Sequence, residues 1–480
     1  MSLAKRNLVT IDDFSNQEIE AVFSLADEMS ESMKEQRNLC SGLIMATLFF
    51  EPSTRTRLSF EAAMHRMGGS VISAVEMGAT SLAKGESIAD MARVVGRYAD
   101  IIVIRHPWEG AAKVAADYAG VPVINAGDGS HEHPTQTLCD LYTLKKERQQ
   151  VKGLKIALCG DLKYGRTIHS LTYALARFGA ARIYFCPGPG LEMPPHVLGK
   201  LTQDYGGKLL KAPADDLHSP TQTLAGQSVD AIYITPSDSH QLALMPGVQI
   251  KIDISEGAIY VTRLQKERAE DVSRGAVSKN DYPVINARLL KGKGFERTLV
   301  MHPLPRIDEL AYEIDADPRS MYFEQAARGV PIRMALVALL LGVKKVDIPE
   351  EEGPSFVQKI DYPVYKRDFG VKCQNPKCVS VQETETRYIK PEFKIIKTKP
   401  LTLRCIYCEH ETHPQYIASA KWHQGILENK RYYSSDSLML ERIKAENLII
   451  FGSESEAQAR GFKRSQYATT PKKVQGGAKR

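Results

Sequence analysis

Short apolar runs alternate with amphipathic helical patterns along the first two thirds of the chain. In a first series, from residue 11 to about residue 150, the apolar runs include residues 42–50 and 101–104. A second series starts at residues 154–159 and continues past residues 183–186. Strands that alternate with helices are typical of parallel sheets covered on both faces. The pattern therefore predicts an α/β fold with two doubly wound parallel-sheet domains and a cleft between them, the usual place for a small-molecule site.

The same pattern predicts the domain boundaries. We expect a first domain over residues 1–150, completed by a long helix at residues 321–343, and a second domain over residues 151–320. Residues 344–370 contain Pro349, Gly353, Pro354 and three successive glutamates, a composition typical of a linker. Behind the linker we predict a small, β-rich domain that contains four cysteines, at residues 371–415.

Charge is concentrated at the end of the chain. Residues 371–480 hold 20 Lys and Arg against 11 Asp and Glu, whereas residues 1–370 hold 43 against 46. We expect residues 416–480 to form a basic, partly disordered tail. Such a tail is either a solvated extension or a surface that meets an acidic partner, and Lys421, Trp422 and His423 resemble a basic, aromatic patch for nucleic acid. We keep nucleic-acid binding as a rival hypothesis that predicts salt-sensitive retention by residues 371–480 alone.

Membrane insertion and export are not expected. The longest apolar run, residues 334–343, is about half as long as a bilayer-spanning helix, and residues 1–7 lack the order of a signal peptide. The predicted compartment is therefore the cytoplasm. In that reducing environment clustered cysteines usually hold a metal rather than form disulfides.

Four of the eight cysteines have the spacing of a metal site. Cys373 and Cys378 form a Cys-x4-Cys pair, and Cys405 and Cys408 form a Cys-x2-Cys pair, with 26 residues between the two pairs. Four thiolates suit tetrahedral zinc, and a closed set of four leaves no open catalytic position. The spacing predicts one structural zinc ion per chain, with four buried free cysteines as the alternative.

An anion-binding motif follows the first apolar run. Residues 50–57, Phe-Glu-Pro-Ser-Thr-Arg-Thr-Arg, lie between a strand candidate and a helical pattern. The hydroxyl groups, the free N–H groups at the start of the helix and a guanidinium group can all face a phosphate dianion. Taken alone, the motif could equally be a Ser or Thr that caps a helix.

Four further segments place polar groups where strands give way to loops: Arg105-His106-Pro107, residues 133–136 (His-Pro-Thr-Gln), residues 163–166 (Lys-Tyr-Gly-Arg) and residues 302–306 (His-Pro-Leu-Pro-Arg). In this order and spacing the five segments resemble the catalytic chain of aspartate carbamoyltransferases over residues 1 to about 345. The resemblance implies that carbamoyl phosphate and L-aspartate are the substrates. It also implies a homo-oligomer built on trimers, whose active sites are shared between subunits.

The resemblance implies a role for each matching residue. The phosphate group would be bound by Ser53, Thr54, Arg55, Thr56 and Arg105, with Ser81 and Lys84 supplied by the neighbouring subunit. Donors to the carbonyl oxygen would be Thr56, Arg105 and His133, and the carbamoyl nitrogen would meet Gln136 and the carbonyl groups of Pro303 and Leu304. The two carboxylates of aspartate would be bound by Arg166 and by Arg263, with Gln265 beside it.

The chemistry needs no cofactor for catalysis. A neutral amine attacks a carbonyl carbon while phosphate leaves, so the protein must stabilise charge on the carbonyl oxygen and on the leaving group. Ornithine as the acceptor is the alternative. The resemblance disfavours it, because ornithine carbamoyltransferases carry a cysteine in the loop that corresponds to residues 302–305. The cations at residues 263–268 would also repel the ammonium group of ornithine.

Two similar stretches depart from the family pattern. Residues 230–236 (Asp-Ala-Ile-Tyr-Ile-Thr-Pro) and residues 257–263 (Gly-Ala-Ile-Tyr-Val-Thr-Arg) lie 27 positions apart, where the family has one strand. We expect an insertion near residues 236–261, and which copy forms the strand is open. It is either a tolerated surface loop or a lid or intersubunit contact that adjusts aspartate binding.

The cysteine segment resembles the zinc domain of the regulatory chains that bind such catalytic trimers. In those chains a nucleotide-binding domain precedes the zinc domain, but here only residues 344–370 lie between the catalytic part and the first cysteine. We therefore expect assembly that depends on zinc and no response to nucleotide effectors.

Overall fold

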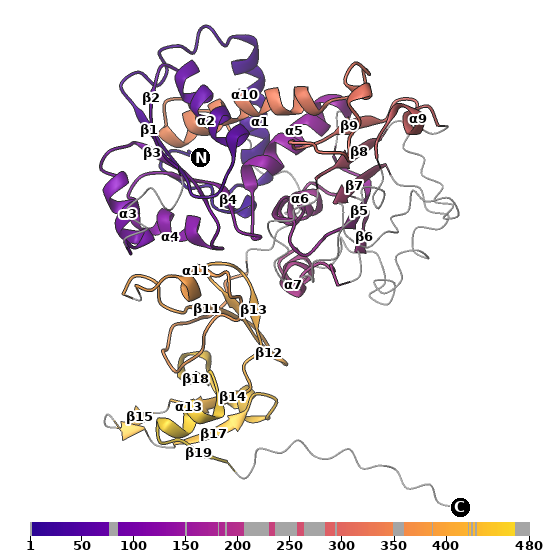
Figure 1. Ribbon diagram of the computed structural model, residues 1–480. Helices are drawn as coiled ribbons and strands as arrows, with labels where there is room; N and C mark the ends of the chain where they lie inside the picture. Colours follow the sequence, from indigo (N-terminus) through magenta and orange to yellow (C-terminus); the bar gives the residue numbers. More distant parts are fainter. Residues whose placement is uncertain are drawn as a thin grey trace, which may run out of the picture. The chain divides into compact units, whose positions relative to one another are not determined.

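The computed structural model describes residues 2–75, 85–148, 151–180, 182–187, 190–205, 230–235, 257–263, 284–292, 295–348, 360–385, 387–420, 422–423, 426–427 and 430–465. They belong to two compact units (Figure 1). Unit 1 comprises residues 1–107 and 111–359, and unit 2 comprises residues 108–110 and 360–480.

The first half of unit 1 is built on a parallel sheet in the order β2-β1-β3-β4. Its strands are β1 (Ile44–Phe49), β2 (Ser70–Val75), β3 (Ile101–His106) and β4 (Val123–Asp128). The connecting helices are α2 (Thr54–Arg66), α3 (Ile88–Val95) and α4 (Ala111–Tyr118). Because β2 and β3 pair with opposite edges of β1, the strand order reverses beside β1. In an open α/β sheet, ligands bind at the carboxyl ends of strands at such a reversal.

The second half of unit 1 repeats this arrangement in a five-stranded parallel sheet, β6-β5-β7-β8-β9. The strands are β5 (Lys155–Gly160), β6 (Arg182–Pro187), β7 (Ala231–Thr235), β8 (Ala258–Val261) and β9 (Leu299–Met301). Its helices are α6 (Arg166–Arg177), α7 (Pro195–Gln203) and the short α9 (Ala287–Leu290). Here β6 and β7 pair with opposite edges of β5, so the second reversal lies beside β5. Two parallel α/β sheets confirm the predicted fold class.

The two similar stretches around the expected insertion both form strands. Residues 231–235 are β7 and residues 258–261 are β8, and the two pair in parallel with Tyr233 opposite Tyr260. Their rings stack with centroids 4.3 Å apart. The sheet therefore holds both copies, and the idea that only one of them occupies the strand position is wrong. Residues 236–256, which include most of the predicted insertion, lie outside the described residues.

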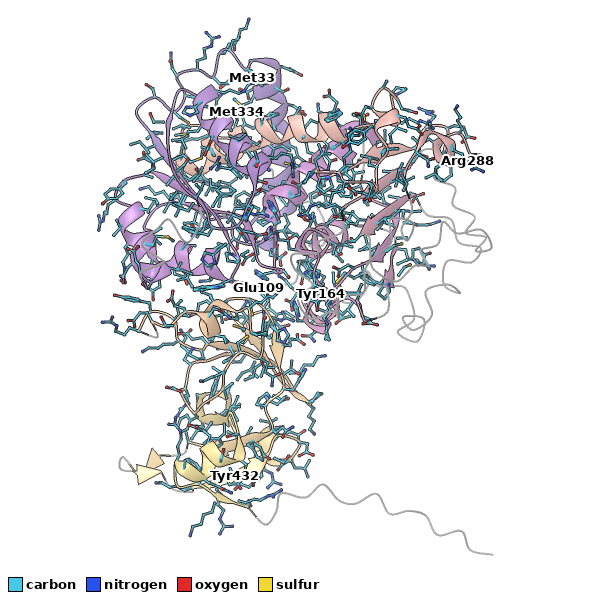
Figure 2. The ribbon with its side chains drawn as sticks, in the orientation of Figure 1. Met33, Glu109, Tyr164, Arg288, Met334 and Tyr432 are labelled. Atoms are coloured by element: carbon cyan, nitrogen blue, oxygen red, sulfur yellow. The ribbon has the colours of Figure 1, made fainter. Side chains whose placement is uncertain are left out.

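Helix α10 (Tyr322–Leu341) completes the first half of unit 1, as the helical pattern at residues 321–343 predicts. It packs against α1 (Asn16–Glu31), α2 and α5 (Pro134–Arg148). Residues 331–340 are buried throughout, including Met334, which is labelled in Figure 2. A helix surrounded by other elements is apolar on all sides, which explains the continuous hydrophobic run. In the described ranges no helix combines the length and hydrophobicity needed to cross a membrane.

Unit 2 begins with an antiparallel sheet that carries the cysteines. Its order is β10-β11-β12-β13, with β10 (Val364–Tyr365), β11 (Phe393–Thr398), β12 (Leu401–Cys405) and β13 (Glu411–Thr412). Strand β10 lies inside the predicted linker at residues 344–370, so the linker ends earlier than expected. The reason is pairing: β10 bonds to β11, which a Pro- and Glu-rich local sequence does not reveal.

A second sheet in unit 2 corrects the expectation of a basic tail over residues 416–480. The strands β14 (Tyr416–Ser419), β17 (Arg431–Ser434), β18 (Leu448–Phe451) and β19 (Lys463–Arg464) form a sheet in the order β18-β14-β17-β19. Ala418, Tyr432, Ile449 and Phe451 are buried in its core. Alternation of polar and apolar residues in strands this short is a weak sequence signal, and the charge balance concealed it.

Candidate active site

The N-terminus of α2 lies where the sequence predicts an anion cradle. Strand β1 ends at Phe49, and α2 begins at Thr54 with Ser53 as its N-cap residue. The Ser53 side chain accepts no capping bond from the helix, so simple capping does not explain this serine. Thr56 is buried in the first turn, whereas Arg55 is exposed. The free N–H groups of a helix start favour an anion at this position.

A carboxylate joins the two predicted arginines. Arg105 at the end of β3 donates from Nη2 to Glu51 Oε1 at 3.0 Å. Arg166, the first residue of α6, donates from Nη1 to Glu51 Oε2 at 2.8 Å and from Nη2 to Glu51 Oε1 at 3.0 Å. A further bond runs from Arg166 Nη1 to the Gly129 carbonyl oxygen at 2.9 Å. Glu51 therefore brings the two strand-order reversals together, one beside β1 and one beside β5.

Glu51 is a site residue that had no predicted role. It lies between the end of β1 and the hydroxyl-rich start of α2, two residues before Ser53. The sequence did contain one indication: Glu51 is an acidic residue in a segment otherwise suited to binding anions. A carboxylate there would repel phosphate unless arginines neutralise it, so its presence indicates arginine partners.

His133 is held as a neutral imidazole. It is buried just before α5, and its backbone N–H donates to Ser170 Oγ at 2.9 Å. The backbone N–H of Gln136 donates to His133 Nδ1 at 3.3 Å, so this nitrogen is an acceptor and the ring proton is on Nε2. Burial, followed by the charges of Arg166 and Arg105, lowers the pKa of His133 well below its usual 6.5. The neutral ring can therefore act as a hydrogen-bond donor through Nε2.

The loop at residues 302–306 reaches the same site. Arg55 Nη2 donates to the Leu304 carbonyl oxygen at 2.5 Å, which joins α2 to the loop after β9. His302 is buried, with Nε2 bonded to Glu309 at 2.8 Å and Nδ1 accepting from the Leu304 N–H at 2.7 Å. Pro303 and Leu304 are half-buried beside it. Leu304 has a φ of 52°, a left-handed backbone conformation that this loop imposes on a non-glycine residue.

Arg263 enters the site from the end of β8. Burial lowers the pKa of Arg55, and the charge of Arg263 lowers it further, so the two guanidinium groups are electrostatic neighbours. The structure thus brings together most of the predicted residues: Ser53, Thr54, Arg55, Thr56, Arg105, His133, Gln136, Arg166, Arg263, Pro303 and Leu304. Ser81, Lys84 and Gln265 lie outside the described residues, so their predicted roles stay predictions.

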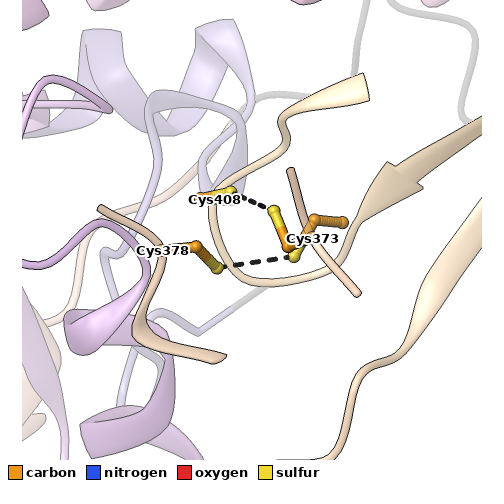
Figure 3. A group of neighbouring side chains, drawn as sticks. Cys373, Cys378 and Cys408 are labelled. Carbon is orange, nitrogen blue, oxygen red and sulfur yellow. Dashed lines mark hydrogen bonds between the residues drawn. The ribbon is translucent and has the colours of Figure 1, made fainter. Parts of the chain in front are cut away.

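The four predicted cysteines of unit 2 form one buried cluster (Figure 3). The sulfur atoms of Cys373 and Cys408 are 3.5 Å apart, and those of Cys378 and Cys405 are 3.8 Å apart. Four tetrahedral bonds of about 2.3 Å place sulfur atoms roughly 3.8 Å from one another, so the cluster fits a tetrahedral metal ion. Hydrogen bonds from the other thiols, that of Cys373 first, lower the pKa of Cys378, whereas burial raises the pKa of Cys405 and of Cys408.

Comparisons with known proteins agree with this geometry. The carbamoyl-P binding domain of aspartate/ornithine carbamoyltransferases matches residues 6–146, and the Asp/Orn binding domain matches residues 254–340. The metal binding domain of the aspartate carbamoyltransferase regulatory chain matches residues 367–418. One chain therefore carries matches to both catalytic and regulatory components.

Relatives of the catalytic part are similar over nearly their whole length. The aspartate carbamoyltransferase catalytic subunit of Thermococcus gammatolerans is 46% identical over 340 residues, which cover 70% of this chain and 98% of the relative. The solved catalytic subunit of the M. jannaschii enzyme is 40% identical, with a TM-score of 0.54 over 70% of this chain and 98% of that one. The Trypanosoma cruzi enzyme in complex with carbamoyl phosphate is 37% identical, with a TM-score of 0.57 over 71% and 97%.

The fold and the comparisons define a carbamoyl-group transferase, with the candidate site at the carboxyl ends of two parallel sheets. Within that class the chain belongs to the aspartate carbamoyltransferase family. It transfers the carbamoyl group of carbamoyl phosphate to L-aspartate and yields N-carbamoyl-L-aspartate and phosphate, the reaction of de novo pyrimidine biosynthesis.

A substitution at Gly127 can test whether activity depends on the position of the Arg166 guanidinium group. The φ of Gly127 is 114°, and an added Cβ would lie 2.9 Å from the guanidinium carbon of Arg166. We expect Gly127→Ala to displace the guanidinium and to lower kcat/KM for aspartate by about tenfold or more, because small misplacements of binding groups are costly. Steady-state kinetics with varied aspartate measures this effect.

Gly120→Ala is the matched control. Gly120 also has a positive φ, 71°, but nothing lies within 4 Å of its added Cβ. Alanine is less strained at a φ of 71° than at 114°, because 71° lies close to the left-handed region that L residues can adopt. Gly120→Ala therefore controls for the added methyl group, and a loss of activity as large as that of Gly127→Ala would show that displacement of Arg166 is not responsible.

Proposed function

We propose that the start of α2 and Arg105 bind the phosphate group of carbamoyl phosphate. The observation that supports this most strongly is the convergence of Ser53, Thr56 and Arg55 on one helix N-terminus, with Arg105 at the adjacent strand end. Hydroxyl groups and guanidinium groups are the donors that a phosphate dianion accepts best. Arg105 is joined to Glu51, so it is oriented before the substrate arrives.

His133, Thr56 and Arg105 then stabilise the carbonyl oxygen during transfer. The neutral amine of aspartate attacks the carbamoyl carbon, a C–N bond forms, and the C–O bond to phosphate breaks. The proton that the amine loses is taken up by the departing phosphate. Negative charge gathers on the carbonyl oxygen before that bond breaks. A neutral His133 with its proton on Nε2 supplies a donor at this point, and the lowered pKa keeps the imidazole in that state.

Arg166 and Arg263 are proposed to bind the two carboxylates of aspartate, with Gln265 beside the second. A guanidinium group has five N–H donors in a plane and grips a carboxylate with two of them. Glu51 fixes the plane of the Arg166 guanidinium, and Arg263 lies at the end of β8 near Arg55. Gln136 and the carbonyl groups of Pro303 and Leu304 are proposed to bind the carbamoyl nitrogen.

A trimer would complete the site, with Ser81 and Lys84 contributed by the neighbouring subunit. One face of unit 1 supports such an interface. Strand β2 lies at the edge of its sheet, and Ile72 and Val75 on it are 40% and 37% exposed, with Leu58 of α2 49% exposed. An edge strand with exposed apolar residues is usually covered by a partner. Ser81 and Lys84 follow β2 directly in the sequence.

Zinc is the proposed metal of unit 2, bound once per chain by Cys373, Cys378, Cys405 and Cys408. Four sulfur ligands at tetrahedral spacing favour zinc among the ions available to a structural site. A reducing compartment such as the cytoplasm would keep these thiols available for the metal. When bound, the ion would link the cysteine turns; the transfer reaction itself would not use it.

His133→Asn should lower kcat by about 10²–10³, the usual cost of losing a donor to a developing oxyanion. Asparagine places its amide near the position of Nδ1, whereas glutamine places one near Nε2, so His133→Gln should recover part of the loss. Similar thermal midpoints for both variants would show that folding is intact. Equal losses in the two variants would contradict the role of Nε2.

The pH profile provides a further check on His133. Since its pKa is lowered in the folded chain, the folded imidazole stays neutral at pH 6.5, where half of the unfolded chains carry a proton. Stability linked to His133 is therefore complete above about pH 6.5 and declines as the pH falls towards the lowered pKa. A kcat limb at pH 6.5 that disappears in His133→Gln would overturn this assignment.

Metal analysis tests the cysteine cluster. We expect one zinc ion per chain in the purified protein and loss of nearly all of it in Cys378→Ser, with a lowered thermal midpoint because metal binding contributes to folding. Cys186→Ser, a buried cysteine of unit 1 outside the cluster, should keep its zinc. Equal zinc content in both variants would rule out the cluster as the site.

We also propose that nucleotides do not control the enzyme, because no domain for them separates the catalytic part from the cysteines. Adding CTP or ATP should leave the aspartate saturation curve unchanged. A clear shift in the half-saturating aspartate concentration with either nucleotide would refute the proposal.

A further inference from the structure

A buried carboxylate beside the active site has no role in the reaction described so far. Asp140, on α5, is fully buried. Gln136 Nε2 donates to its Oδ1 at 2.9 Å, Gln325 Nε2 donates to the same oxygen at 2.7 Å, and the Tyr260 hydroxyl donates to Oδ2 at 3.1 Å. The three donors come from α5, α10 and β8, so both halves of unit 1 meet at this carboxylate.

The contacts of Asp140 determine which way two amides face. An ionised carboxylate only accepts hydrogen bonds, so each glutamine must turn its nitrogen towards Asp140 and its oxygen away. For Gln325 this is corroborated at the other end, where Oε1 accepts the backbone N–H of His302 at 3.0 Å. A backbone N–H can only donate, so the orientation of Gln325 is fixed at both ends.

Above neutral pH, Asp140 is in the ionised form that accepts these hydrogen bonds. Burial raises its pKa to about 7, while the bonds from Gln136, Gln325 and Tyr260 and the charge of Arg333 oppose the rise. Binding assays at pH 8 or above therefore examine the form that accepts all three bonds.

Both glutamines bound to Asp140 connect it to the proposed contacts of the carbamoyl nitrogen. Gln136 lies in the first turn of α5 and, with its nitrogen bound to Asp140, must present Oε1 on the opposite side of its amide. On the other side, Gln325 holds the backbone of His302, which leads directly into Pro303 and Leu304. Gln136 Oε1 and the carbonyl oxygens of Pro303 and Leu304 are all hydrogen-bond acceptors. Together they can recognise an NH₂ group, which donates hydrogen bonds.

We propose that Asp140 is a positioning residue that orients both sets of acceptors for the carbamoyl nitrogen, Gln136 Oε1 directly and the Pro303-Leu304 carbonyl groups through Gln325. The inference rests on the proposed roles of Gln136 and of that loop. Asp140 thereby gives the enzyme its preference for an acyl phosphate that carries NH₂ over one that carries a methyl group. It touches no substrate atom itself.

Acetyl phosphate separates this role from a purely structural one, because it has a methyl group in place of the carbamoyl NH₂. Asp140→Leu keeps a similar side-chain volume and removes the oxygen that both glutamines share, because Gln136 and Gln325 donate to the same Oδ1. Both amides then lose the contact that sets which way they face. At pH 8, we expect the dissociation constant of carbamoyl phosphate to rise about tenfold or more, on the order of one lost hydrogen bond with a donor left unpaired. The inhibition constant of acetyl phosphate should change by less than about threefold on the same physical ground, since it makes no such bond.

Two outcomes would overturn the proposal: equal weakening of both ligands, which a general loss of structure predicts, or no weakening of either. Asp117→Leu is the control, since Asp117 is exposed and, in the described part of the chain, forms an ion pair with Lys113. It should bind both ligands like the unaltered enzyme.

Gln325→Met keeps the experiment decisive if Asp140→Leu does not fold. It cuts the link to His302 while preserving side-chain length, and it should again weaken carbamoyl phosphate selectively. Equal weakening of both ligands in this variant would equally refute the proposal. Gln136→Met tests the underlying site assignment on its own: if it fails to discriminate between the two ligands, the proposed role of Gln136 fails, whatever Asp140 does.

Discussion

The bridge from Glu51 to Arg105 and Arg166 is the interaction on which the active site depends. Two substrates with several negative charges require several cations, and Arg55, Arg105, Arg166 and Arg263 would repel one another if nothing lay between them. A single carboxylate from the loop after β1 offsets part of that repulsion and orients two guanidinium groups. Because Arg105 lies on β3 and Arg166 begins α6, the bridge also joins the two halves of unit 1.

The remaining cationic charge determines the state of His133. Buried near two arginines, an imidazolium would add a further positive charge in a poorly solvated place, so the ring stays neutral. The N–H of Gln136 then selects the tautomer. The start of α5 therefore supplies a hydrogen-bond donor, His133 Nε2, in a defined orientation. A backbone N–H group of the helix, rather than another charged side chain, determines which ring nitrogen carries the proton. Asp140 shows the complementary arrangement one turn later, a buried acceptor that neutral amides and a phenol satisfy.

Different interactions stabilise unit 2. Its sheets are small, and short sheets bury little apolar surface, so a metal held by four thiolates would contribute folding free energy that the core alone does not supply. The second sheet of unit 2 contains none of the cysteines and relies on aromatic packing instead, with Phe451 against Phe369 and Phe462. Residues expected to form a tail thus form a core of their own.

Local patterns in the sequence were sufficient for the alternation of strands and helices, the helix that became α10, the cysteine spacing and the order of the anion-binding segments. Each depends on residues within a few positions of one another, because helical period, capping and ligand spacing are local properties. The tertiary structure alone decided the pairing of Glu51 with Arg166, 115 residues away, and of Asp140 with Gln325, 185 residues away. It also decided that both β7 and β8 enter the sheet and that β10 joins unit 2. Those contacts depend on strand register and on which side chains two distant elements bring face to face, and no local spacing carries that information.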